Sequence, residues 1–327
     1  MSTKFKERVF SGVQPSGEQV HIGNYLGAMR RFVSLAEDFE TIICLVDLHA
    51  LTSVTSPNEL RSYSESLVAS YLAIGLDPEK ITIFRQSDVP QVCELTWYLA
   101  CNFPLGLLER AHALKDARGK NVAANAGLMF YPILMAADIL LYRASKIPVG
   151  ADQKQHLEMT RDVAQRFNTH YGELFPIPEP LIDEDTGVIP GLDGRKMSKS
   201  YDNYIGLFES SKTVKKKIMR IVTDSKTVEE KKDPEPCNIF NIYRLFAQPQ
   251  EIEDLASRYR EGGMGYGEAK LALYEAVERE LAPLRESYEG WIQRKDDLGD
   301  ILRQGANKAL EIASPTIEDV RKAIGVA

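Results

Sequence analysis

Cysteine is scarce in this sequence and forms no recognisable cluster. Four cysteines occur in 327 residues, with no CxxC pair and no grouping with histidine; they are Cys44, Cys93, Cys101 and Cys237. Zinc sites and disulfide frameworks need such groupings, so neither is expected and the thiols are predicted to be buried and reduced. A convincing Ser/His/Asp or Cys/His set is also missing, which argues against a covalent nucleophile.

Long apolar runs are missing too. No stretch is long enough to cross a bilayer, and the N-terminal segment MSTKFKERVF lacks the apolar run of a signal peptide. We therefore expect a cytoplasmic protein with no membrane partner. Hydrophobic residues make up 44% of the chain and charged residues 27%, which is typical of a globular fold, and the length of 327 residues favours two domains.

Positive charge does not dominate the chain. The net charge of -7 argues against a surface built for DNA, although local basic patches can still meet phosphates. One such patch is KTVKKKIMR at 212–220, where helical spacing places Lys212, Lys216 and Arg220 on one side. A solvated helix face is the ordinary interpretation of this run, and contact with RNA phosphates is the alternative.

The order of elements predicts an α/β fold. Strand-like runs at 8–12, 41–47, 80–87 and 146–150 alternate with amphipathic helical runs, which is typical of a parallel sheet covered on both faces. Beyond residue 205 the pattern becomes helical. We predict a Rossmann-like catalytic domain over residues 1–205 and a smaller, all-helical domain over 206–327.

Two helices carry more detailed expectations. The helix over 24–39 is predicted to turn Leu26, Met29, Val33 and Ala36 inward. The last helix is predicted to begin at Ser314–Pro315, where it can pack back on the catalytic domain.

A glycine-rich loop follows the first predicted strand. It ends in HIGN at 21–24, where a helix is expected to start near Gly23. Ligands of open α/β sheets bind at the carboxyl ends of strands, and a helix N-terminus there attracts phosphate. His21 and Asn24 add hydrogen-bond donors, whereas a GxGxxG dinucleotide fingerprint is absent. A packing role for the glycines remains the alternative.

A second candidate for phosphate binding is the segment GRKMSKS at 194–200. Lys196 and Lys199 supply two cations, and Ser198 and Ser200 supply hydroxyls. Such a set suits the leaving phosphates of a nucleotide. Taken alone, the segment is more typical of a solvated turn than of a binding site.

An apolar helix at 130–143, FYPILMAADILLYR, is predicted to begin at Pro132 and contains one acid. Helical spacing places Tyr131, Met135 and Asp138 on a single face. A buried carboxylate must accept hydrogen bonds, either from an internal partner or from a substrate. An aromatic N–H or O–H would suit Asp138, with Met135 against the ring, but this chemistry does not separate tryptophan from tyrosine.

HIGN at 21–24 together with KMSKS at 196–200 resembles the signature pair of the class I aminoacyl-tRNA synthetases. Asn24 at the fourth position of the first motif is a form met in their tryptophan-specific branch. The stretches YPILMAADILLY and IPVGADQKQHLEMTRD resemble this branch more than its tyrosine-specific relative. The resemblance covers nearly the whole chain.

The resemblance implies the substrates ATP, tryptophan and the tRNA for tryptophan, Mg²⁺ arriving with ATP without dedicated protein ligands, and a homodimer formed through the helices after residue 89. The implied catalytic residues are His21, Asn24, Lys196 and Lys199. The implied ATP contacts are Gln14, Pro15, Ser16, Gly23, Asn24, Gly150, Ala151, Asp152, Ile189, Lys196, Met197, Ser198, Lys199 and Ser200. For tryptophan the resemblance implies Asp138 on the indole N–H, Tyr131 and Gln153 on the amino and carboxylate groups, and Met135 and Gln14 nearby.

One segment departs from the family pattern. AHALKDARGK at 111–120 has Ala117 at a position that in the family often carries a lysine bound to ATP. Either Lys115, Arg118 or Lys120 replaces that lysine, or the loop closes on ATP in a different way. The open alternatives are a tyrosine-specific enzyme, a non-catalytic RNA-binding paralogue, and a small-molecule nucleotidyltransferase. The last of these would have no use for the helical domain.

Overall fold

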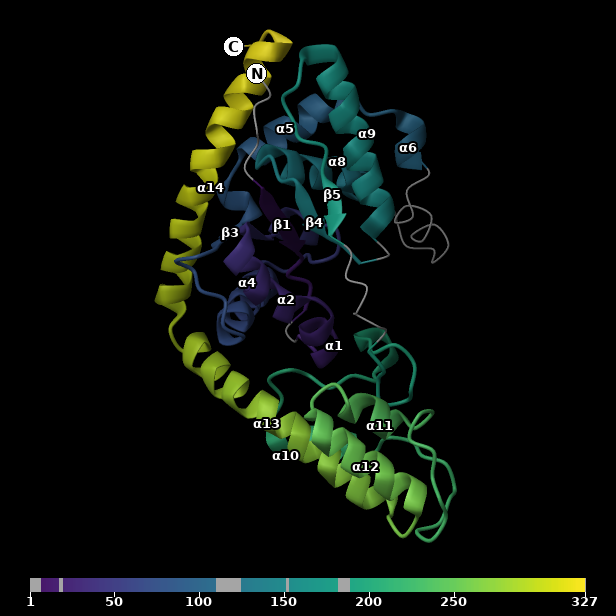
Figure 1. Ribbon diagram of the computed structural model, residues 1–327. Coiled ribbons are helices and arrows are strands. Elements are labelled where there is room, and N and C mark those ends of the chain that lie inside the picture. Colours follow the sequence, from purple (N-terminus) through teal and green to yellow (C-terminus); the bar gives the residue numbers. More distant parts are fainter. Residues whose placement is uncertain (1–6, 18–19, 110–124, 151–152, 182–188, 327) are drawn as a thin grey trace.

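The protein consists of an α/β body and a helical lobe, with one long helix running from the lobe to the body and a second running along the body (Figure 1). The computed structural model describes residues 7–17, 20–109, 125–150, 153–181 and 189–326. We call the part built on the sheet the body, and the part containing α10 to α12 and the first half of α13 the lobe. The α/β prediction is confirmed by five parallel strands in the order β3-β2-β1-β4-β5.

The strands match the predicted runs closely, with one addition. Their bounds are β1 Arg8–Val13, β2 Glu40–Leu45, β3 Thr82–Arg85, β4 Lys146–Pro148 and β5 Glu179–Leu181. The segment that contains β5 reads as loop in the sequence because it is rich in proline. Pro180 lies inside β5, which is possible because β5 is an edge strand and needs no donor on its free side.

Helices cover both faces of the sheet. On one face lie α1 Ile22–Asn24, η1 Tyr25–Met29, α2 Arg30–Asp38 and α4 Pro57–Ala73; on the other lie α5 Gln91–Ala100, α8 Ala126–Leu141 and α9 Lys154–Tyr171. The short α3 Asp47–Ala50, η2 Gln86–Asp88 and α6 Leu105–Glu109 complete the body. Alternate strand residues serve the two cores: Ile43 packs in the first and Ile42 in the second.

Two predicted helix starts are wrong. The apolar helix begins before Pro132, because Asn125 caps α8 by accepting a hydrogen bond from the Leu128 amide. The C-terminal helix does not begin at Ser314–Pro315, since α14 runs without interruption from Lys295 to Ile324.

The inward face of the helix predicted over 24–39 also differs from the prediction. Tyr25, Met29, Phe32 and Leu35 are buried, whereas Leu26, Val33 and Ala36 are only partly buried. The cause is the π-helical turn η1, in which the Arg30 amide donates to the Tyr25 carbonyl five residues earlier. One wide turn rotates the side chains relative to a regular helix.

The lobe is helical and shares a core with the body. It contains α10 Ser211–Met219, α11 Asn238–Tyr243, α12 Pro249–Glu261 and the first half of α13 Tyr266–Ile292. The first core cluster continues from Val9 and Ile43 of the sheet through Ile205 to Leu255 and Leu273 of the lobe. Buried apolar side chains therefore continue from the body into the lobe along this path.

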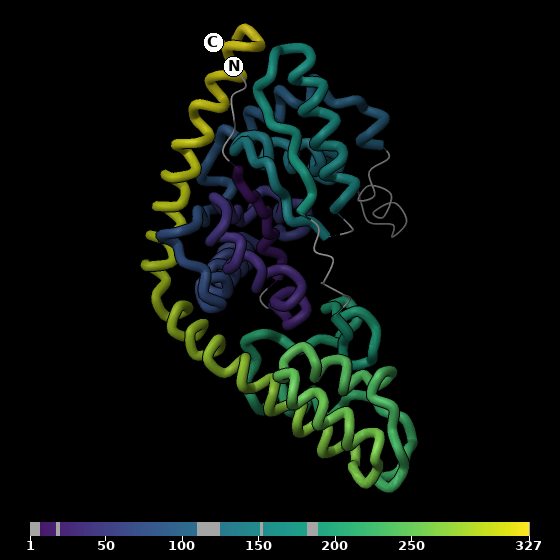
Figure 2. Tube along the Cα trace, in the orientation of Figure 1, coloured from purple at the N-terminus to yellow at the C-terminus, as the bar shows by residue number. Residues whose placement is uncertain are grey.

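The last helix covers one edge of the sheet. After α13 leaves the lobe, α14 runs along the body back toward the N-terminal strand, so both chain ends lie at the same end of the molecule (Figure 2). Gly305 of α14 lies so close to β3 that a Cβ would come within 1.8 Å of the Ile83 carbonyl oxygen. Lys308 also donates to the Pro78 carbonyl at 3.0 Å.

Candidate active site

The candidate site lies where the strand order reverses. β1 has β2 on one side and β4 on the other, so the loops after β1 and β4 diverge at the carboxyl end of the sheet. This switch point is the usual ligand position in open α/β sheets. The predicted ATP contacts Gln14, Pro15 and Ser16 directly follow β1, and Gly150 follows β4.

His21 and Asn24 hold each other at the start of α1. The Asn24 amide donates to Nδ1 of His21, and the His21 amide donates to Oδ1 of Asn24, both at 3.2 Å. This reciprocal cap satisfies two backbone donors that a helix start leaves open. Because Nδ1 of His21 accepts a hydrogen bond, the proton of the neutral ring lies on Nε2. The donors available to a ligand are therefore Nε2–H of His21 and the side-chain NH₂ of Asn24.

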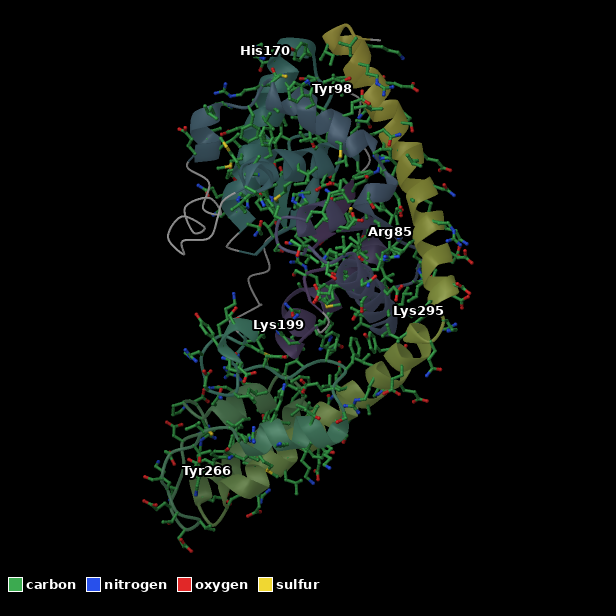
Figure 3. The ribbon with its side chains drawn as sticks, turned by 180° about the vertical axis from the view of Figure 1, so that it is seen from behind. Arg85, Tyr98, His170, Lys199, Tyr266 and Lys295 are labelled. Atoms are coloured by element: carbon green, nitrogen blue, oxygen red, sulfur yellow. The ribbon has the colours of Figure 1, made fainter. Side chains whose placement is uncertain are left out.

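The electrostatic environment keeps His21 neutral. Burial, together with the positive charge of Lys199, lowers the pKa of His21 to about 4. The Lys199 ammonium lies over Gly17, where a Cβ would meet Nζ at 3.0 Å. Partial desolvation in turn lowers the pKa of Lys199. Figure 3 shows Lys199 at the junction of body and lobe.

The KMSKS segment is a tight loop with a buried asparagine at its base. Asn203 is 3% exposed; its Oδ1 accepts from the Ser198 amide at 2.8 Å, and its Nδ2 donates to Asp193 at 2.7 Å and to the Lys196 carbonyl at 3.1 Å. A Cβ on Gly191 would clash with Asn203, including its carbonyl oxygen at 2.6 Å. Gly191 therefore allows close packing on Asn203.

Backbone contacts join the two motifs. His21 and Gly206 form an antiparallel bridge, and the Ile22 amide donates to the Ile205 carbonyl at 3.0 Å. Met197 also packs near Gly23, whose Cβ position lies 3.4 Å from the Met197 Cβ and 2.9 Å from the His21 ring. The two predicted motifs thus meet in one site, and only glycine fits between His21 and Met197.

Asp138 has internal donors, contrary to the idea that it needs one from a substrate. His49 Nε2 lies 3.0 Å from Oδ2, and Gln86 Nε2 donates to both carboxylate oxygens at 2.8 and 2.9 Å. All three side chains are almost fully buried, and burial raises the pKa of Asp138 against the opposite effect of its two partners. These contacts leave part of the carboxylate's acceptor capacity unused.

Two histidines link the other predicted tryptophan contacts to Asp138. The Tyr131 ring meets the His49 ring edge-on at 4.3 Å between centroids, and the His156 ring at 5.7 Å. Nδ1 of His156 lies 3.0 Å from Oε1 of Gln153. A chain of contacts therefore runs from Asp138 through Tyr131 to Gln153, while Met135 is partly buried in the second core cluster.

The other predicted positions fall into two groups. Ile189 lies at the base of the KMSKS loop and accepts from the Met197 amide at 2.9 Å, and Lys196, Ser198 and Ser200 lie on that loop. Ala151, Asp152 and the segment at 111–120 lie outside the described residues.

Sequence reasoning did not identify His49, Gln86, His156 or Asn203 as site residues. A signal for two of them exists, because Gln86 directly follows the carboxyl end of β3 and His49 lies four residues after that of β2. Within the described ranges no group of three or more His, Cys, Asp or Glu side chains is placed to hold a metal ion. In the same part of the chain, no helix is both long and apolar enough to span a membrane.

The fold and site define a Rossmann-like α/β protein in which the HIGN and KMSKS segments meet at the switch point of the sheet. A family model described as tRNA synthetases class I (W and Y) matches residues 3–282. The chain therefore belongs to this family.

Relatives from several bacteria support this placement. The tryptophan--tRNA ligase of Rhodopirellula baltica is 47% identical over 98% of this chain and 99% of its own, and that of Fusobacterium nucleatum is 46% identical over 98% of both. The crystal structure of Campylobacter jejuni tryptophanyl-tRNA synthetase, complexed with ADP and tryptophan, is 44% identical with a TM-score of 0.93, covering 97% of this chain and 99% of that one.

Proposed function

We propose that this protein is a tryptophan-tRNA ligase. The observation that carries the proposal is the meeting of His21, Asn24 and Lys199 at the switch point. Near-full-length identity of 44–47% to bacterial tryptophan--tRNA ligases supports the same reaction. An RNA-binding paralogue without catalysis would not need this intact set of phosphate-directed donors.

The first half-reaction forms the adenylate. A carboxylate oxygen of tryptophan attacks the α-phosphorus of ATP, the bond to the β-phosphate oxygen breaks, and pyrophosphate leaves. In this proposal Nε2–H of His21 and the side-chain amide of Asn24 donate to the phosphates, and Lys196 and Lys199 balance the charge of the leaving group. Mg²⁺ would arrive on the ATP phosphates and share that charge.

The second half-reaction consumes the adenylate. A hydroxyl of the terminal ribose of the tRNA attacks the aminoacyl carbonyl, and AMP leaves with the electron pair of the acyl–phosphate bond. Neither step needs a protein nucleophile. The protein therefore acts by orienting the reactants and by stabilising charge.

For tryptophan recognition we propose the buried cluster. Asp138 retains acceptor capacity for an indole N–H, and Tyr131 and Gln153 lie along the connected path where amino and carboxylate groups are expected. Phenylalanine offers no such donor, so the cluster would reject it. The ATP contacts carried over from the family stand as part of the same proposal.

The helical lobe is proposed to bind the tRNA and to read its anticodon. The last helix of the domain predicted over 206–327, α14, packs on the body instead. Lys212, Lys215, Lys216 and Arg220 are exposed on and just after α10 and are available to phosphates. Lys217 is not, because it turns inward and bonds Glu209 at 2.5 Å and the Tyr204 carbonyl at 3.0 Å. This sorting divides the basic run into a phosphate-facing set and a structural lysine.

A cytoplasmic homodimer completes the proposal. Trp97 on α5 is 65% exposed and Leu105 on α6 is 59% exposed, values that suit a surface covered by a second copy. Cys93 on α5 and Cys101 just after it are also exposed, so the prediction of buried thiols is wrong for these two residues. Sedimentation velocity checks the dimer, and a monomer at micromolar concentration would count against it.

Amino-acid-dependent ATP/pyrophosphate exchange tests the proposed function. We expect exchange with tryptophan and far less with tyrosine or phenylalanine. Exchange with tyrosine alone would establish the tyrosine-specific alternative, and no exchange with either amino acid would establish the non-catalytic one. Charging of tRNA in a second assay separates a full ligase from a protein that only forms adenylates.

A further inference from the structure

The catalytic turn is followed by a rare π turn that begins at Tyr25. The Tyr25 amide donates to the His21 carbonyl at 3.1 Å, and the Tyr25 carbonyl accepts from the Arg30 amide. Tyr25 is therefore attached to the His21–Asn24 turn on one side and to α2 on the other. Single π turns persist mainly where surrounding contacts hold them, and they occur often at functional sites.

The side chain of Tyr25 reaches a different part of the fold. Its ring is 5% exposed, and its hydroxyl donates to Oε1 of Glu280 at 2.6 Å. Glu280 lies on α13 and is half-buried. A short hydrogen bond to a carboxylate, shielded from water on the tyrosine side, fixes the distance between α13 and the catalytic turn.

Helix α13 is the element that joins lobe and body. Its first half packs on α10 and α11 in the lobe, and its second half packs on α4 of the body. In Figure 1 it runs from the lobe to the point where α14 begins along the body. Glu280 lies between these regions, so it moves with α13 when the lobe changes position relative to the sheet.

A second contact of the same kind lies further along α13. The Tyr288 hydroxyl is 2.9 Å from the Ser66 hydroxyl on α4, and the Tyr288 ring stacks on Phe208 with centroids 4.1 Å apart. This contact also ties α13 to the body. It does not touch the His21–Asn24 turn, and so provides a matched comparison for Tyr25–Glu280.

We propose that Tyr25 and Glu280 are a positioning pair for adenylate formation, which sets the orientation of His21 and Asn24 according to the position of α13. The inference rests on the proposed function and extends it. The hydrogen bond between Tyr25 and Glu280 fixes the turn relative to α13. While the lobe is correctly placed, Nε2–H of His21 and the side-chain amide of Asn24 then point to the phosphates. Without the bond, the π turn can relax toward a regular helix, which rotates Asn24.

The physical consequence is a loss of turnover without a loss of substrate binding. Displacing a catalytic donor by about 1 Å can cost on the order of 100-fold in rate. Neither Tyr25 nor Glu280 is placed among the tryptophan contacts, so the KM for tryptophan should stay constant. A merely structural contact would instead lower thermal stability and leave kcat of the folded enzyme unchanged.

The test measures tryptophan-dependent ATP/pyrophosphate exchange of the full chain, without tRNA. Tyr25→Phe and Glu280→Ala are each expected to lower kcat about tenfold, and the double variant no further than either single one. Glu280→Gln, which keeps an acceptor, should recover most of the rate. Tyr288→Phe removes one hydroxyl contact between the same helix and the body and should stay within about twofold of the parent.

The outcomes are distinct. A kcat for Tyr25→Phe within about twofold of the parent, multiplicative effects in the double variant, or an equal loss in Tyr288→Phe would each overturn the positioning pair. If Tyr25→Phe does not fold, Glu280→Ala and Glu280→Gln decide the question by the same kcat comparison. An inactive parent protein would instead overturn the proposed function.

Discussion

His21 and Asn24 each accept the other's backbone amide, at 3.2 Å in both directions. The arrangement makes two side chains that are proposed to act in catalysis part of one helix cap. Their reactive atoms are therefore placed by local backbone geometry, within four residues of sequence. It also assigns the proton of the neutral His21 ring to Nε2.

The low pKa of His21 predicts a pH dependence of stability. The pKa of His21 is about 4 in the folded protein and 6.5 in the unfolded chain, so the unfolded chain takes up the proton first as the pH falls. The contribution of neutral His21 to folding stability is therefore fully present above pH 6.5 and is lost as the pH falls toward 4. His21→Asn keeps a capping side chain without the titration. Thermal melts at pH 7 and pH 5 should show a larger loss for the parent than for this variant. Equal losses would contradict a neutral, buried His21.

Removing Asn203 should loosen the KMSKS loop. Asn203→Ala deletes three hydrogen bonds at the base of the loop, so we expect kcat for exchange to fall about 10- to 100-fold. Stability should fall by about 1–3 kcal/mol, because buried backbone partners lose their bonds. Asn241→Ala, which loses one bond to the Glu235 carbonyl in the lobe, serves as the control. An exchange rate equal to that of the control would refute the bracing role.

Local patterns were sufficient for four strands and for the positions of both motifs, but not for β5 or for partners that come from distant segments. Four strands are visible as short apolar runs, whereas β5 is hidden because Pro180 lowers its β propensity. His49, Gln86 and Asp138 meet only because three separate elements, α3, η2 and α8, pack together, which no spacing along the chain shows. The inward face at Tyr25 was missed because a π turn breaks the regular period of a helix.

Gly305 should be essential for seating the last helix. Gly305→Ala places a Cβ within 1.8 Å of the Ile83 carbonyl oxygen. Because this oxygen belongs to the backbone of β3 and cannot rotate away as a side chain could, α14 must move away from β3. We expect a loss of about 3 kcal/mol or more in unfolding free energy, measured by urea denaturation. Gly299→Ala on the same helix meets only the flexible end of Arg303 at 3.3 Å and should stabilise by about 0.5–1 kcal/mol. Similar values for both variants would rule out close packing at Gly305.

Substituting Asp138 tests whether its remaining acceptor capacity recognises indole. Asp138→Ala should reduce the preference for tryptophan over phenylalanine in exchange about 100-fold, while the KM for ATP stays nearly constant. Asp47→Asn is the matched control, because Asp47 is a second buried acid at the same sheet edge whose oxygens bond Ser87. This control should lose stability but keep the preference. If Asp138→Ala retained the parental preference, Asp138 would be a core acid held by His49 and Gln86, and specificity would have to come from the shape of the pocket.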